Sequence, residues 1–215
     1  MSVRGASMTR RRLLLSVALA ALSAIQTAAR AQQGSERSAA ELMDAVMWGK
    51  EPIGGSFELT DHTGRRRTDA DFRGKLLLVY FGFTFCPDIC PTDLLAIGLA
   101  LDRLGQAGEA VQPLFISVDP ERDTPDRLAQ YVPSFHPRLI GLTGSAEEIR
   151  KAASEYRVYF AKVPVSSGPE YTIDHSSFIY LMDQDGKYLG FFPPGTSAEH
   201  MAKVVGSRLA APANH

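Results

Sequence analysis

The two cysteines of the chain lie four positions apart, in the segment Cys86-Pro87-Asp88-Ile89-Cys90-Pro91. A continuous apolar run at residues 75–83 precedes this segment, and Pro91 suits the first position of a helix, so both thiols are expected where a strand leads into a helix. Unpaired N–H groups and the helix dipole at such a turn favour the thiolate form of cysteine. Because thiolates attack disulfides and bind metal ions, the pair predicts redox chemistry, metal binding or both.

The residue types narrow the kind of metal that the pair could bind. A purely structural disulfide stays open as an alternative, although closing so short a loop removes only about 2 kcal/mol of unfolded-state entropy. Zinc usually takes four ligands, and the sequence has neither a second cysteine pair nor an H-x-x-x-H cluster. Two soft sulfurs suit Cu(I), and an added imidazole lets a site also hold Cu(II). Copper bound by two sulfurs and one nitrogen is therefore the better chemical match.

One of the five histidines stands where it could join the cysteines. His175, in the segment Asp174-His175-Ser176-Ser177, precedes a predicted strand at residues 178–182, at a loop–strand boundary that can return to the start of the first helix. Asp174 could orient the imidazole ring. The other histidines occupy a turn, an aromatic–proline segment, the last predicted helix and the C-terminus: His62, His136, His200 and His215.

The hydrophobic pattern predicts the elements that would hold such a site. Apolar runs indicate strands at residues 57–59, 75–83, 114–118, 139–142, 178–182 and 188–192. Helices are expected after Pro91, after the cap Thr124-Pro125, from the capping box of Ser145 and Glu148 to about residue 156, and from near Thr196 to Leu209. This order predicts an α/β, thioredoxin-like fold, in which a mixed β-sheet is flanked by helices on both faces.

The N-terminus has the features of an export signal. Arg10-Arg11-Arg12 precedes the apolar stretch Leu13–Ile25, which is shorter than the roughly 18 residues that span a bilayer, and Ala29-Arg30-Ala31 suits a signal peptidase. We expect residues 1–31 to be a signal peptide or an N-terminal anchor, exported by the general or the twin-arginine route. A flexible polar linker at 32–46, the domain at 47–210 and a C-terminal tail at 211–215 would follow.

These features place the protein in the periplasm or tethered to the outer face of the inner membrane, where thiols can oxidise. A formal net charge of −1 shows no bias toward nucleic acid. Neither G-x-G-x-x-G nor G-K-[ST] occurs, so no nucleotide cofactor is indicated.

Three motifs together resemble the Sco/SenC family: Phe83 to Pro91 around the cysteines, Val118-Asp119-Pro120-Glu121-Arg122-Asp123-Thr124-Pro125, and Asp174-His175-Ser176. The resemblance extends from about Ile53 to Leu209. It implies a thioredoxin-like fold with copper on Cys86, Cys90 and His175. The acidic loop, from Asp119 to Asp126, is then expected near the copper site, where Asp119 or Asp123 could tune the site or contact a partner. The turn Arg65-Arg66-Arg67 is expected to be solvated.

The resemblance also implies a function. Proteins of this family act as metallochaperones that help to mature the binuclear copper centre of cytochrome c oxidase. The copper-accepting oxidase subunit would be the main partner, with other periplasmic copper chaperones or thiol reductants, and the N-terminus could associate with the membrane. The alternative is a periplasmic thiol–disulfide oxidoreductase with Cys86 and Cys90 as its redox-active pair, although such enzymes usually have a C-x-x-C spacing. A peroxide-reducing enzyme fits less well, because Thr84 is one position too close to Cys86 for T-x-x-C.

Overall fold

The computed structural model describes residues 52–165 and 171–210. The predicted signal or anchor, the linker, the start of the domain at residues 47–51 and the C-terminal tail lie outside the described residues. The strands are β1 (Glu58–Asp61), β2 (Arg66–Thr68), β3 (Leu76–Gly82), β4 (Val111–Ser117), β5 (Ile140–Thr143), β6 (Phe160–Pro164), β7 (Tyr171–His175), β8 (Ile179–Met182) and β9 (Tyr188–Phe192). The α-helices are α3 (Ile89–Leu104), α4 (Pro125–Tyr131), α5 (Ala146–Glu155) and α6 (Ala198–Ala210), and short 3-10 helices cover Asp69–Phe72, Gly105–Ala110 and Val132–Ser134.

Seven strands form one mixed sheet in the order β2-β1-β5-β4-β3-β8-β9. The central strands β3, β4 and β5 are parallel, whereas β1, β2, β8 and β9 add to the two edges in antiparallel fashion. All seven residues of β3 and all seven of β4 are buried, as expected for parallel strands that are covered on both faces. The sequence predicted both strands, although β4 begins at Val111, three residues before the predicted strand at 114–118.

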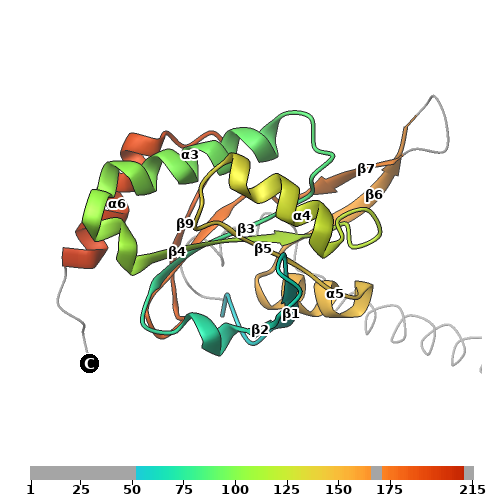
Figure 1. Cartoon of the computed structure of the whole chain (residues 1–215), viewed down its shortest axis with the longest axis horizontal. Coiled ribbons are helices and arrows are strands. Elements are labelled where there is room, and N and C mark those ends of the chain that lie inside the picture. The colour runs from blue at the N-terminus through green and yellow to red at the C-terminus, as the bar shows by residue number, and fades with distance from the viewer. Residues whose placement is uncertain (1–51, 166–170, 211–215) are drawn as a thin grey trace, which may run out of the picture. The chain divides into compact units, whose positions relative to one another are not determined.

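Helices cover both faces of this sheet (Figure 1). On one face, the ring of Tyr80 in β3 stacks on Phe115 in β4, which contacts Tyr131 at the end of α4. The next residue of β3, Phe81, points the other way and packs against Tyr156 at the end of α5. Successive side chains of a strand alternate between faces, so these contacts place α4 and α5 on opposite sides. The predicted thioredoxin-like fold with flanking helices is confirmed.

The predicted helix caps are present. Thr124 accepts a hydrogen bond from the backbone N–H of Arg127 and starts α4, with Pro125 as the first helical residue. Ser145 and Glu148 cap each other's backbone N–H groups at the start of α5. The first helix begins at Ile89, so Pro91 lies within its first turn, and the last helix begins at Ala198, two residues later than predicted.

Strand β2 and a two-stranded sheet were not predicted. Strands β6 and β7 pair only with each other and form a separate two-stranded antiparallel sheet, which projects from the main sheet in Figure 1. We call these two strands the histidine hairpin, because His175 is the last residue of β7. In the part of the chain that the structure describes, no helix is both long and apolar enough to cross a membrane.

Candidate metal centre

The two cysteines lie in the connection from β3 to α3, as predicted. Cys86 precedes the helix and is partly exposed, whereas Cys90 lies in the first turn of α3 and is completely buried. The backbone N–H of Cys90 points toward the sulfur of Cys86, at an N···Sγ distance of 3.5 Å. Both residues are free thiols. The helix N-terminus therefore offers an N–H donor that stabilises negative charge on Cys86.

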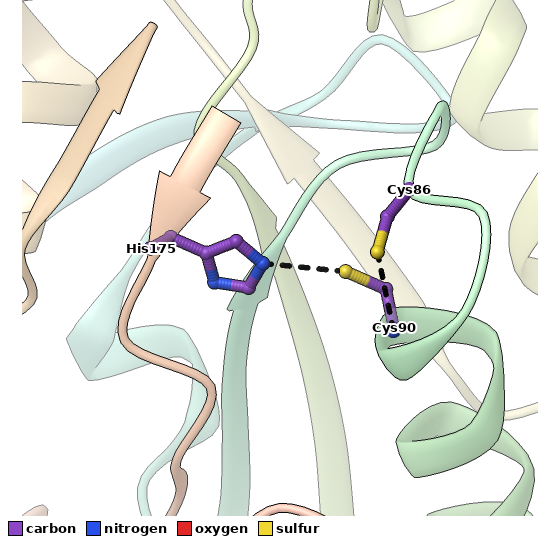
Figure 2. A group of neighbouring side chains, drawn as sticks. All are labelled: Cys86, Cys90 and His175. Atoms are coloured by element: carbon purple, nitrogen blue, oxygen red, sulfur yellow. Dashed lines mark hydrogen bonds between the residues drawn. The ribbon is translucent and has the colours of Figure 1, made fainter. Parts of the chain in front are cut away.

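His175 completes a three-residue cluster (Figure 2). Its Nε2 atom lies 3.4 Å from the sulfur of Cys90, and the two sulfurs and a ring nitrogen all lie within 4.8 Å of one another. No other group of three His, Cys, Asp or Glu side chains is brought together in this way within residues 52–165 and 171–210. The sequence expected these three residues to share a site, and the fold brings them together from segments 85 positions apart.

The orientation of the imidazole follows from its second nitrogen and from two aromatic rings. Nδ1 lies 3.2 Å from the carbonyl oxygen of Ser176, which can only accept, so Nδ1 carries a proton and Nε2 is the nitrogen that faces the sulfurs. Phe83 and Tyr80 pack edge-on against the imidazole, with ring-centroid distances of 5.8 and 6.3 Å. Asp174, expected to orient the ring, is exposed, and the Ser176 carbonyl serves instead.

The electrostatics make the two thiols unequal. A hydrogen bond from Cys90 lowers the pKa of Cys86 to about 4, aided by His175 and by backbone N–H groups, and together these outweigh the effect of burial. The same hydrogen bond, together with burial, raises the pKa of the Cys90 thiol above its ordinary value. The cluster therefore contains one accessible thiolate and one buried thiol, which is an arrangement suited to either metal capture or disulfide exchange.

The acidic loop contributes structure near the site. Asp119 and Asp123 are both completely buried. Asp123 accepts hydrogen bonds from the backbone N–H and the hydroxyl of Thr84, at 2.9 and 2.6 Å, and from Ser117 at 2.6 Å. Asp123 therefore supports the cysteine loop, the segment from Phe83 to Cys90, and neither buried carboxylate forms a contact surface for a partner.

Two other groups of sequence candidates lie elsewhere. Arg66 and Arg67 belong to strand β2, so the expected turn is wrong at these positions, although Arg66 is exposed as expected. Arg66 pairs with Glu58 and Glu148, and Arg67 pairs with the buried Asp61. Of the remaining histidines, His62 accepts a hydrogen bond from the backbone of Gly141, His136 accepts one from Arg138, and His200 lies in α6 near Phe192. His215 lies outside the described residues.

The sequence interpretation missed the side chains that join the cysteine loop to the histidine hairpin. Arg122 in the acidic loop and Tyr171 at the start of β7 make these contacts, which are described below. The motif around Arg122 predicted a role near the site only for its carboxylates, Asp119 and Asp123. The Ser, Gly and Pro residues at 166–169, between two short segments with β-forming residues, were the signal for a hairpin.

The protein is therefore of the thioredoxin-like class and has a two-sulfur, one-nitrogen site. The site consists of the C-x-x-x-C turn and the histidine that lies beside both sulfurs. The sequence model of the SCO1/SenC family matches residues 46–210 of the chain. The chain belongs to this family.

Known proteins agree with this assignment. A mitochondrial SCO2 homolog from Bos taurus is 48% identical over 159 residues, which cover 73% of this chain and 60% of that protein. The structure of Bradyrhizobium japonicum ScoI with copper bound is 45% identical, with a TM-score of 0.68, over 72% of this chain and 98% of that one. A more distant structure is BsSco, described as a member of the Sco family of cytochrome c oxidase assembly proteins with a disulfide switch. It is 25% identical, with a TM-score of 0.57, over 75% of this chain and 98% of that one. This chain spans between 43% and 62% of the length of these curated relatives.

Proposed function

We propose that this protein binds one copper ion through Cys86, Cys90 and His175 and delivers it to the subunit of cytochrome c oxidase that holds the binuclear copper centre. The observation that carries the proposal is the approach of three suitable ligand atoms to within 4.8 Å of one another. Two sulfurs and an imidazole nitrogen suit copper in both of its common oxidation states. Membership of the SCO1/SenC family and the copper-bound structure of the Bradyrhizobium relative support the same assignment.

The unequal burial of the ligands suits a protein that releases its metal. Cys86 is accessible and already ionised at neutral pH, so it can capture copper without first losing a proton. An incoming thiolate from the acceptor can approach from the side of Cys86, while the buried Cys90, together with His175, still holds the ion. Ligand exchange then passes the ion on without exposing it to water as a free cation. Other periplasmic copper chaperones or thiol reductants would load or reduce the site.

The same proposal includes the location of the protein. Residues 1–31 would direct export and either be removed or remain as an anchor, residues 32–46 would act as a tether, residues 47–210 would form the copper-binding domain and residues 211–215 a short tail. The site would then lie in the periplasm, free or held at the outer face of the inner membrane. There the cysteine pair can cycle between dithiol and disulfide, and only the dithiol can bind copper.

Copper titration of the reduced protein tests the site. We expect about one equivalent to bind, and both Cys86→Ser and His175→Ala to weaken binding and change the Cu(II) absorption spectrum. His200→Ala is the matched control, because His200 is exposed in α6 and belongs to no metal cluster. Copper-loaded protein should then restore copper to an apo fragment of the oxidase subunit. Unchanged affinity in both site variants would contradict the proposal.

A second candidate is a thiol–disulfide oxidoreductase, which the asymmetry of the two thiols favours. The Cys86 thiolate would attack a disulfide of a partner protein and release one partner thiolate. Cys90 would lose its proton and attack the resulting mixed disulfide, so that Cys86 and Cys90 become a disulfide and the partner gains two electrons. One of the two protons that the partner thiols need comes from Cys90 and the other from water. His175→Ala distinguishes the candidates, because a reductase should tolerate the change and a copper chaperone should not.

A further inference from the structure

The acidic loop between β4 and α4 holds the segment that leads into the cysteines. Asp123 binds Thr84 through both its backbone N–H and its hydroxyl. Arg127 donates a hydrogen bond to the same hydroxyl at 3.1 Å and lies over the ring of Phe85, at 5.2 Å from the ring centroid. Phe85 immediately precedes Cys86 and is 53% exposed, so burial alone does not hold it in place.

Arg122, in the same loop, contacts both the cysteine segment and the histidine hairpin. Its guanidinium carbon lies 4.6 Å from the centroid of the Phe85 ring on one side and 3.9 Å from that of Tyr171 on the other. Its Nη1 donates a hydrogen bond of 3.0 Å to the backbone carbonyl of Tyr171. Its Nε is paired with the buried Asp119, whose other oxygen accepts a hydrogen bond of 2.7 Å from the Tyr171 hydroxyl.

This placement matters because the hairpin is not part of the main sheet. Strands β6 and β7 pair with each other, so backbone pairing with the seven-stranded sheet does not set the position of the hairpin. Tyr171 is the first residue of β7 and His175 is the last. The short connection at residues 176–178 ties the hairpin to β8 of the main sheet, and side-chain contacts add to this restraint. Arg122 joins the residue before Cys86 to the strand that carries His175.

We propose that Arg122 is a positioning residue that holds the histidine hairpin against the cysteine loop and so sets the geometry of the metal centre. The inference rests on the proposed copper site. The planar guanidinium is suited to this role, since it stacks between two rings while its N–H groups bind a carboxylate and a carbonyl. Lysine has neither the plane nor the fork of donors. Partners that orient metal ligands in this way typically change metal affinity about 10- to 100-fold when they are replaced.

The experiment compares Arg122→Lys with Arg127→Lys in the full, reduced protein. Lysine keeps a positive charge beside buried Asp119, so the fold should survive. Arg127 is the matched control, because it also lies over Phe85 and binds Thr84 but makes its contacts on the cysteine side. With Cu(I) in competition with a chelator, we expect Arg122→Lys to raise the dissociation constant about 10- to 100-fold and to alter the Cu(II) spectrum. Arg127→Lys should change the constant by less than about threefold.

A variant at His175 shows whether the effect acts through the imidazole. If Arg122 positions the hairpin, adding Arg122→Lys to His175→Ala should produce no further loss of copper affinity, because the ligand that it positions is gone. Phe85→Leu provides a second variant that leaves the Asp119 pair intact, and it should weaken copper binding in the same direction as Arg122→Lys. Because Phe85 is half exposed, the fold should survive this change.

Several results would overturn the role of Arg122 and leave the proposed copper site unaffected. These are wild-type copper affinity in Arg122→Lys, an equal loss in Arg127→Lys, or the same loss from Arg122→Lys with and without His175. Failure of the wild-type protein to bind copper, or wild-type binding in His175→Ala, would instead remove the proposed copper site and the role of Arg122 with it.

Discussion

The reactivity of Cys86 toward iodoacetamide should be almost independent of pH between pH 6 and pH 8 in the reduced, metal-free protein. Only the thiolate reacts, and the hydrogen bond from Cys90 lowers the pKa of Cys86 to about 4. Cys86 would then be about 99% thiolate already at pH 6. An ordinary thiol with a pKa of about 8.5 is about 0.3% thiolate at pH 6 and about 24% at pH 8, so its rate rises roughly 80-fold over this range.

The assay is a time course of alkylation at several pH values, with the modified cysteine identified by peptide mass spectrometry. The shape of the pH profile is the readout, because a thiolate of low pKa is also a weaker nucleophile and its absolute rate is less informative. Cys90 should stay unmodified, since it is completely buried. The same protein in urea is the control, in which both cysteines should titrate as ordinary thiols.

Two variants separate the causes of the shift. Cys90→Ala removes the hydrogen-bond donor with the largest effect on Cys86, so the alkylation rate should again rise with pH between 6 and 8. His175→Ala removes a smaller contribution and should move the profile less. The reasoning is refuted if the rate at Cys86 in the wild-type protein rises about tenfold per pH unit over this range, as it does for a free thiol.

Three further changes test interactions that stabilise the fold. Asp61→Asn should lower the free energy of unfolding by about 3 kcal/mol at pH 7. Burial by itself would raise the pKa of Asp61, but hydrogen bonds from Thr63, Arg67 and Arg65 outweigh burial and keep this pKa below its usual range. A lowered folded-state pKa stabilises the protein above the unfolded-state pKa of about 4, so the difference from wild type in urea unfolding should shrink as the pH falls below 4. Gly82→Ala would place a methyl group 3.0 Å from the sulfur of Cys90 and should cost about 2 kcal/mol in the same assay, whereas Gly206→Ala, with its nearest contact at 3.4 Å, should not destabilise. Ser145→Ala removes the cap of α5 and should cost about 1 kcal/mol, and unfolding like that of wild type would contradict the role of the cap.

The strands and helices of the main sheet were predictable because their signals are local. β3 is a continuous apolar run, β4 has the apolar run Leu114–Ile116 at its centre, and both strands are buried along their whole length. The caps at Thr124 and Ser145 depend on residues within three positions along the chain. Strand β2 was missed because its three residues include two arginines, whose partners Glu58, Asp61 and Glu148 become neighbours only after folding.

The sequence alone determined the position of the two sulfurs. Cys86 and Cys90 are four residues apart at a strand-to-helix turn, so local backbone geometry holds them together before any distant segment contacts them. The tertiary structure decided which thiol is ionised, because Cys90 is completely buried and donates a hydrogen bond to the sulfur of Cys86. It also decided where the imidazole lies, since His175 is 85 positions away on a separate hairpin held by Arg122. Contacts between segments so far apart depend on packing in three dimensions, which no local pattern records.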